Sequence, residues 1–273
     1  YASRMSRATR VEFSGAIYHV MSRGVARMPV FLSDRDRADF LERVRSTVED
    51  GRLVVHAFCL MPNHYHLLCE TPGGELRTLI REINGGYARR FNRAHRRVGH
   101  LWQGRYKAIL VEDGPYFLEC SRYIHLNPNR SRLTRPAERY RWSSYRSYVG
   151  GPRGVDWVSR ERTLAAFDGE PSRYRSWVES GKGERPVDPF ERAVAGLVLG
   201  GERYVEKIRA MLRSEETSAD RPSLRKLKVQ EMRSAADVEA VVAEIARNEL
   251  PRRRRRLLLY ALRLYSALPV GAT

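Results

Sequence analysis

Residues 60–71 read LMPNHYHLLCET and place two histidines, His64 and His66, two positions apart in an alternating apolar run. Side chains two positions apart on a strand point to the same face of the sheet. The two imidazoles can therefore bind one metal ion together, while Tyr65 and Leu67 point to the other face. The spacing alone also fits a strand that carries two half-exposed histidines and no metal.

The segments on either side of this strand alternate between strand and helix patterns. The Pro-Asn pair at 62–63 predicts a turn, and apolar runs predict strands at 16–22, 53–60, 65–70 and 107–112. Helical spacing predicts helices at 33–50 and 75–96, and Pro115 begins a third helix that ends before Pro128. The order β-α-β-β-α-β-α predicts an α+β fold, a ferredoxin-like antiparallel sheet with helices on one face.

A Gly-rich stretch at 150–154 predicts a boundary between two regions. Residues 1–150 would form the α+β domain. Residues 151–273 would form an all-α C-terminal region, a candidate for auxiliary DNA binding. Its helices are predicted at about 160–167, 171–180, 189–199, 202–213 and 235–268.

The composition is strongly basic. The 273 residues include 50 Lys and Arg against 32 Asp and Glu, a net charge of +18, and 45 of the 50 are Arg because only five are Lys. The Arg side chain binds phosphate through a planar fork and stacks on bases. A GC-rich genome would favour Arg over Lys, but it would not produce the excess of base over acid. We therefore expect a nucleic-acid partner.

Three widely spaced cysteines argue against a disulfide framework and against a CxxC zinc site. Cys59 and Cys69 lie in apolar strands and are expected in the core. No apolar run reaches transmembrane length, and the N-terminal residues lack the apolar segment of a signal peptide. We therefore expect the protein in the cytoplasm.

A second group of candidate residues lies on the predicted helix that begins at Pro115. Tyr116, Cys120, Tyr123 and Asn127 follow at spacings of four, three and four, which places them on one helical face. If this face packs beside the histidine strand, the amide of Asn127 becomes a third metal ligand and a tyrosine hydroxyl becomes a nucleophile. A phenol with a pKa near ~10 needs activation, and a divalent cation would polarise the scissile phosphate. The spacing also fits tyrosines that only pack in the core.

Residues 81–107 contain eight Lys or Arg and one acidic residue, Glu82, with aromatic residues interleaved. This combination suits single-stranded or hairpin nucleic acid, which is bound through phosphate contacts and base stacking. The alternative is a helix whose aromatic residues face the core and whose arginines face water. We expect Phe91 in the core and the loop 93–105 on DNA. The Arg run at 252–256 fits a solvated face.

Five motifs resemble the REP-associated tyrosine transposases, which are single-tyrosine HUH transposases. They cover about residues 10–150, in the family's order. The motifs are GAIYHVMSRG (15–24), HAFCLMPNHYHLLCETP (56–72), GHLWQGRYKAILVE (99–112), RYIHLNPNR (122–130) and RWSSYRSYVG (141–150).

This resemblance implies roles for individual residues. His64 and His66 match the HUH ligands, Asn127 the third ligand of Mg²⁺ or Mn²⁺, and Tyr123 the nucleophile. The implied reaction is the cleavage and joining of single-stranded DNA at hairpins of repetitive extragenic palindromes, through a 5′-phosphotyrosine intermediate. The residues that we expect to contact DNA are Arg23, Arg93, Arg96, Arg97, Trp102, Arg105 and Lys107.

The resemblance further implies a bacterial, nucleoid-associated protein that works as a monomer or a homodimer. Its helical tail is similar to the DnaA-like C-terminal region of longer relatives. Two other functions stay open: a catalytically silent protein that binds DNA or RNA hairpins on the same fold, and a metal-dependent hydrolase whose nucleophile is water. The intact ligand and tyrosine set argues against the first, and the lack of a nearby carboxylate pair argues against the second.

Overall fold

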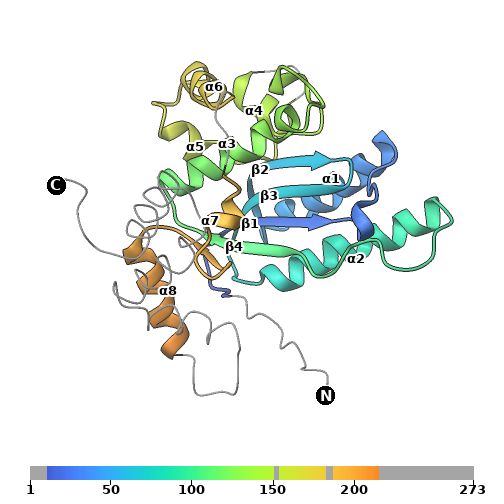
Figure 1. Cartoon of the computed structure of the whole chain (residues 1–273), viewed down its shortest axis with the longest axis horizontal. Helices are drawn as coiled ribbons and strands as arrows, with labels where there is room; N and C mark the ends of the chain where they lie inside the picture. The colour runs from blue at the N-terminus through green and yellow to red at the C-terminus, as the bar shows by residue number, and fades with distance from the viewer. Residues whose placement is uncertain (1–10, 151–153, 183–186, 215–273) are drawn as a thin grey trace, which may run out of the picture. The chain divides into compact units, whose positions relative to one another are not determined.

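The computed structural model describes residues 11–150, 154–182 and 187–214, all within one compact unit, Arg10–Ser214 (Figure 1). None of the helices in these ranges is long and apolar enough to span a membrane. The helices and strands in chain order are β1 (Ala16–Arg23), α1 (Asp34–Glu49), β2 (Val54–Met61), β3 (His64–Thr71), α2 (Leu76–Ala94), β4 (Lys107–Val111), α3 (Pro115–Arg130), α4 (Tyr145–Val149), α5 (Glu161–Ala165), α6 (Pro171–Ser180), α7 (Pro189–Arg192), β5 (Val198–Leu199) and α8 (Glu202–Ser214).

The strands form one sheet in the order β2-β3-β1-β4-β5. β1 pairs antiparallel with β3 and with β4, and β2 pairs antiparallel with β3. These four strands and the connecting helices α1 and α2 make the ferredoxin-like arrangement, which confirms the predicted α+β class. The sequence did not indicate β5, which adds to the β4 edge in parallel and makes the sheet mixed.

Helices cover both faces of the sheet. Tyr65 of β3 is fully buried on the face of α1 and α2, where its ring lies 4.6 Å from that of Phe40 and its hydroxyl donates to Asn84 at 2.9 Å. The next residue, His66, faces α3 and contacts Asn127. The prediction of helices on one face therefore holds for α1 and α2, while α3 forms a further layer on the opposite face.

The core predictions for single residues are confirmed. Cys59 and Cys69 are fully buried, and Phe91 is 1% exposed. Both cysteines are free thiols.

The predicted end of α3 before Pro128 is wrong, because the helix continues through this residue to Arg130. Pro128 lacks the N–H that would donate to the carbonyl of Ile124. The helix nevertheless goes on, since Pro128 is buried and the N–H of Ser131 donates to the carbonyl of Asn127 at 3.0 Å. Tertiary packing here outweighs the local preference of proline to end a helix.

The predicted helix at 189–199 is wrong beyond Arg192. The chain turns at Ala195 and Gly196, whose φ angles are 53° and 68°, and Val198–Leu199 then pairs as β5. An open sheet edge offers unpaired backbone groups, and strand pairing satisfies them. The helix predicted at 235–268 lies outside the described residues.

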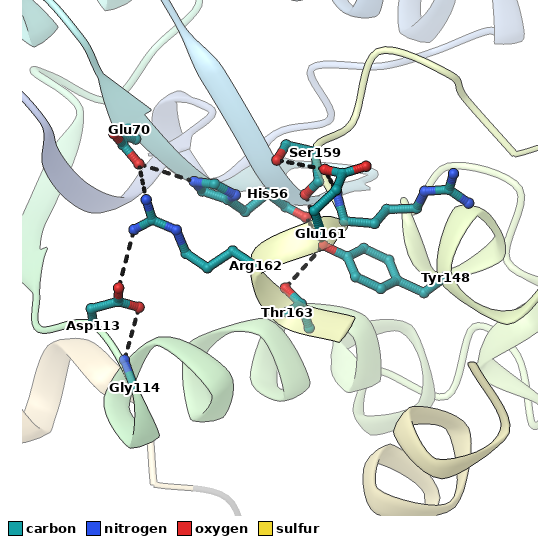
Figure 2. Close-up of polar contacts among 10 residues, drawn as sticks. His56, Glu70, Asp113, Gly114, Tyr148, Ser159, Glu161, Arg162 and Thr163 are labelled. Carbon is teal, nitrogen blue, oxygen red and sulfur yellow. Dashed lines mark hydrogen bonds and ion pairs between the residues drawn. The ribbon is translucent and has the colours of Figure 1, made fainter. Parts of the chain in front are cut away.

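Elements after residue 150 are tied to the sheet by an ionic network (Figure 2). Arg162 of α5 lies between Glu70, near the end of β3, and Asp113, just before α3, at 3.0 and 3.3 Å. His56 of β2 approaches the same Glu70 at 3.6 Å, and Asp113 accepts from the N–H of Gly114 at 2.8 Å. The segments on both sides of the predicted boundary thus belong to the same compact unit.

A buried polar network holds α3 on the sheet. His125 lies between two hydroxyls, that of Tyr174 of α6 at 2.7 Å from Nδ1 and that of Ser144 at 2.8 Å from Nε2. The Tyr174 hydroxyl also lies 2.7 Å from Ser121 Oγ, and Ser144 accepts from the N–H of Phe58 on β2 at 2.8 Å. Burial lowers the pKa of His125 to about 3, so the imidazole is neutral, with one donor and one acceptor. The network fixes which face of α3 is turned to the sheet.

Removing the central hydroxyl of this network should destabilise the fold. We expect Tyr174→Phe to lower the free energy of unfolding by about 1–3 kcal/mol, because Ser121 and His125 stay buried and lose a partner. Tyr145→Phe is the matched control, since its buried hydroxyl has no hydrogen-bond partner among the described residues. Urea unfolding of both variants measures the difference, and equal losses would contradict the network.

Candidate active site

The structure brings together the two histidines, the amide and the tyrosine that the sequence singles out. The imidazole rings of His64 and His66 have centroids 5.0 Å apart and lie nearly perpendicular, at 84°. Asn127 of α3 places its amide nitrogen 3.4 Å from His66 Nε2. The ring of Tyr123, one turn earlier on α3, lies 5.7 Å from the ring of His66.

In both histidines Nδ1 contacts a neighbouring side chain. His64 Nδ1 is 2.7 Å from Asn63 Oδ1, and the amide nitrogen of Asn63 donates to the carbonyl of Arg27 at 3.0 Å. The oxygen of Asn63 therefore accepts from Nδ1–H, which leaves the lone pair of His64 Nε2 for a ligand. His66 Nδ1 is 2.9 Å from Nε2 of His19 on β1.

The residues fit a divalent cation. In the described part of the chain no three His, Cys, Asp or Glu side chains gather as a metal site, and the side chain beside His66 Nε2 is the amide of Asn127. Rotation of this amide by 180° presents its oxygen where the nitrogen lies. Burial lowers the pKa of His64 to about 4 and that of His66 well below its usual range, so both imidazoles are neutral, the form that binds a metal.

Tyr123 is half-buried beside a fixed positive charge. The guanidinium of Arg130 lies 4.9 Å from the centre of the phenol ring, and it donates to the carbonyl of Tyr123 at 3.2 Å. Burial raises the pKa of Tyr123 to about 12, with Asp188 acting in the same direction and Arg130 against it. The phenol is therefore protonated at neutral pH.

Sequence reasoning missed two residues that pack beside the site. His19 is fully buried against His66, and burial lowers its pKa to about 3. Phe190 of α7 packs on His19 with ring centroids 4.6 Å apart. One signal was present, because His19 is a lone polar residue in the apolar strand AIYHVM at 16–21. The sequence around Phe190 gives no such indication, because the position of Phe190 depends on how the chain returns to the sheet after residue 150.

The predicted DNA-binding residues lie in two places. Arg23 pairs with His64 across the β1–β3 ladder, directly beside the proposed metal ligands. The others lie in the segment from the end of α2 to the start of β4. Four of these are exposed, namely Arg93, Arg96, Arg105 and Lys107.

The remaining two predicted contacts also make packing contacts. The guanidinium of Arg97 lies 5.8 Å from the ring of Phe91. Trp102 is half-buried, its indole N–H donates to the carbonyl of Asn84 at 3.1 Å, and its ring lies 5.7 Å from that of Tyr65. The part of the indole that packs on Tyr65 is not available for stacking on a base.

Residues 12–127 match the family model described as "Transposase IS200 like". The match confirms the resemblance that the motifs indicated. The family consists of DNA-processing enzymes. No curated protein matches the chain at a significant level.

Two solved structures are similar to the chain. One is a REP-associated tyrosine transposase bound to a REP hairpin, with 19% identity, a TM-score of 0.46, and coverage of 57% of this chain and 92% of that one. The other is a putative transposase from Deinococcus radiodurans R1, with 21% identity, a TM-score of 0.31, and coverage of 46% of this chain and 92% of that one.

The effect of the Arg130 charge on the pKa of Tyr123 should be measurable. We expect Arg130→Met to raise the pKa of the Tyr123 phenol further, because the variant removes the cation above the ring and leaves the burial. A pH titration of ¹³C-tyrosine-labelled protein by NMR, with the resonance assigned through Tyr123→Phe, measures the shift. Arg192→Met is the control, since Arg192 lies over Tyr116 at 5.9 Å. An unchanged pKa in Arg130→Met would contradict this role.

Proposed function

We propose that this protein is a metal-dependent single-stranded DNA endonuclease and strand transferase that uses Tyr123 as its nucleophile. The observation that carries the proposal is that the candidate residues of α3 lie beside the two histidines of β3. Tyr123 and Asn127, one turn apart on α3, contact the neutral imidazole of His66 on β3, and the imidazole of His64 lies beside that of His66. The match of residues 12–127 to the IS200-like transposases supports the same chemistry.

The proposed reaction exchanges one phosphate ester for another. The Oη of Tyr123 attacks the scissile phosphorus, and the bond from phosphorus to the 3′ oxygen breaks. The leaving strand takes up a proton and ends in a 3′ hydroxyl, while the phenol loses its proton and holds the 5′ phosphate. Because the phosphodiester is kept, a 3′ hydroxyl can later attack the phosphotyrosine and rejoin the strand without ATP.

His64, His66 and Asn127 would hold Mg²⁺ or Mn²⁺. When bound, the cation polarises the scissile phosphate and neutralises the charge that develops in the transition state. Arg23 beside His64 and Arg130 above Tyr123 add fixed positive charge at the same place, which favours a bound phosphate.

The proposed substrate is a DNA hairpin of the REP type. The motif resemblance supports this substrate, and so does the exposed basic segment after α2, where arginines are free to reach phosphates on the surface. In this proposal residues 1–150 carry the chemistry, residues 151–273 add DNA contacts, and the protein acts as a monomer or a homodimer.

The nucleophile can be identified by covalent trapping. With a labelled single-stranded hairpin and Mg²⁺ or Mn²⁺, the parent protein should form a DNA adduct that survives denaturing electrophoresis. We expect Tyr123→Phe to lose the adduct and the cleavage while its hairpin affinity stays within a few-fold, and EDTA to stop both in the parent. Tyr116→Phe is the control and should keep the adduct.

Each other outcome of this experiment points to another function. An adduct that survives in Tyr123→Phe and is lost in Tyr116→Phe would transfer the role to Tyr116. Cleavage without any adduct would favour water as the nucleophile. Binding without cleavage by the parent would identify a silent hairpin-binding protein.

The salt dependence of binding tests the DNA surface. Each phosphate contact contributes about −0.7 to −0.9 to the log–log slope of affinity against salt. Replacing Arg93, Arg96, Arg97 and Arg105 together by Gln should therefore flatten the slope by up to about three units, with Arg97 adding less because it stacks on Phe91. Fluorescence anisotropy over a salt series measures the slopes. Neutralising residues 252–256 should change the slope less, and a larger change there would reverse the assignment.

A further inference from the structure

The two proposed metal ligands on β3 differ in how Nδ1 is held. Asn63 fixes the proton of His64 on Nδ1, because the amide orientation is set by its own bond to the Arg27 carbonyl. The contact between His66 and His19 joins two ring nitrogens at 2.9 Å, so either one can be the donor. The ring nitrogen of His66 that carries the proton therefore depends on which ring nitrogen of His19 carries one.

Only one of the two arrangements leaves His66 able to bind a metal. If His19 carries its proton on Nε2, it donates to His66 Nδ1, and a neutral His66 then holds its own proton on Nε2, the atom that faces Asn127. If His19 carries its proton on Nδ1, its Nε2 accepts from His66 Nδ1–H, and the lone pair of His66 Nε2 is free. A metal at this site selects the second arrangement.

The surroundings of His19 show that a proton on its Nδ1, as the second arrangement requires, is unfavourable for stability. His19 is fully buried between His66, Phe190 and Tyr123, with ring centroids 5.1, 4.6 and 5.9 Å from its own. Its Nδ1 is buried and has no hydrogen-bond partner in the described part of the chain. A buried N–H without an acceptor destabilises a fold, so an apolar residue would serve packing better than histidine does here.

We propose that His19 is a positioning residue for the metal site: it accepts the Nδ1–H bond of His66, fixes the plane of that ring, and turns the Nε2 lone pair toward Asn127. The proposal rests on the proposed function, in that it takes His66 to be a metal ligand. Such a partner typically changes metal affinity 10–100-fold, because it sets both the tautomer and the orientation of the ligand.

Two variants of β1 should each change only one of two properties, the affinity for Mn²⁺ or the stability of the fold. Mn²⁺ affinity of the full chain is measured from the EPR signal of free Mn²⁺, without DNA, and stability from the melting temperature. His19→Phe should bind Mn²⁺ about 10–100-fold more weakly and keep its melting temperature within a few degrees. Ile17→Ala changes a buried residue two positions away on the same face of β1, and it should melt earlier but keep its Mn²⁺ affinity.

Two further variants make the result specific. His19→Gln can still present an acceptor to His66 Nδ1, so it should restore Mn²⁺ affinity to within a few-fold of the parent. In ¹⁵N-histidine NMR spectra with Mg²⁺, His66 should be protonated on Nδ1 in the parent and in His19→Gln. His64→Ala tests the proposed metal site itself, and it should lose Mn²⁺ binding.

The outcomes separate a failure of this inference from a failure of the proposed function. If the parent binds no Mn²⁺, or if His64→Ala binds like the parent, the metal site of the proposed function is wrong. If His64→Ala loses binding but His19→Phe binds like the parent, the role of His19 alone is wrong. A loss of affinity in His19→Phe that only follows a large fall in melting temperature, with no recovery in His19→Gln, would also overturn the positioning role.

Discussion

The packing of α3 on the histidine face of the sheet is the contact on which the candidate site depends. Successive side chains of β3 point to opposite faces, so Tyr65 enters the layer of α1 and α2 while His66 meets α3. A shift of one residue in the pairing of β3 would exchange the two faces and bury the imidazole in the wrong layer. The fully buried phenol of Tyr65, bonded to Asn84, opposes such a shift from the far side of the sheet.

The proposed nucleophile, Tyr123, and the proposed amide ligand, Asn127, are placed by groups that take no part in the proposed chemistry. His125 lies between them on α3 and points away, into the network with Tyr174 and Ser144. Because helical residues two positions apart face different sides, this network sets the rotation of α3 about its axis. The candidate site is thus built on a strand and a helix that are each fixed by buried contacts. These contacts limit how far the groups of the site can move relative to one another.

The sequence allowed the site to be predicted as far as local periodicity reaches. The two-residue spacing on β3 and the four-residue spacing on α3 each defined a face, and the structure brings these faces together. The residues that pack against these two faces depend on pairing between distant parts of the chain, which no local sequence pattern predicts. His19 reaches His66 across 47 positions through the β1–β3 ladder, and Phe190 arrives after the chain has left the sheet and returned to pair as β5. Pro128 was misjudged for the same reason, since burial of the helix outweighed its local effect.

The charges around Tyr123 bear on the proposed cleavage and rejoining of DNA. An aryl phosphate ester is easier to break than the alkyl ester of DNA, because a phenolate is a weaker base than an alkoxide. Burial raises the pKa of Tyr123 to about 12, so the phenolate is costly to form, and in the proposed reaction the phenol must pass its proton to an acceptor when it attacks. Asp188, just before α7, contributes to the same increase, while Arg130 opposes it from α3. A residue after position 150 therefore contributes to the pKa of the proposed nucleophile.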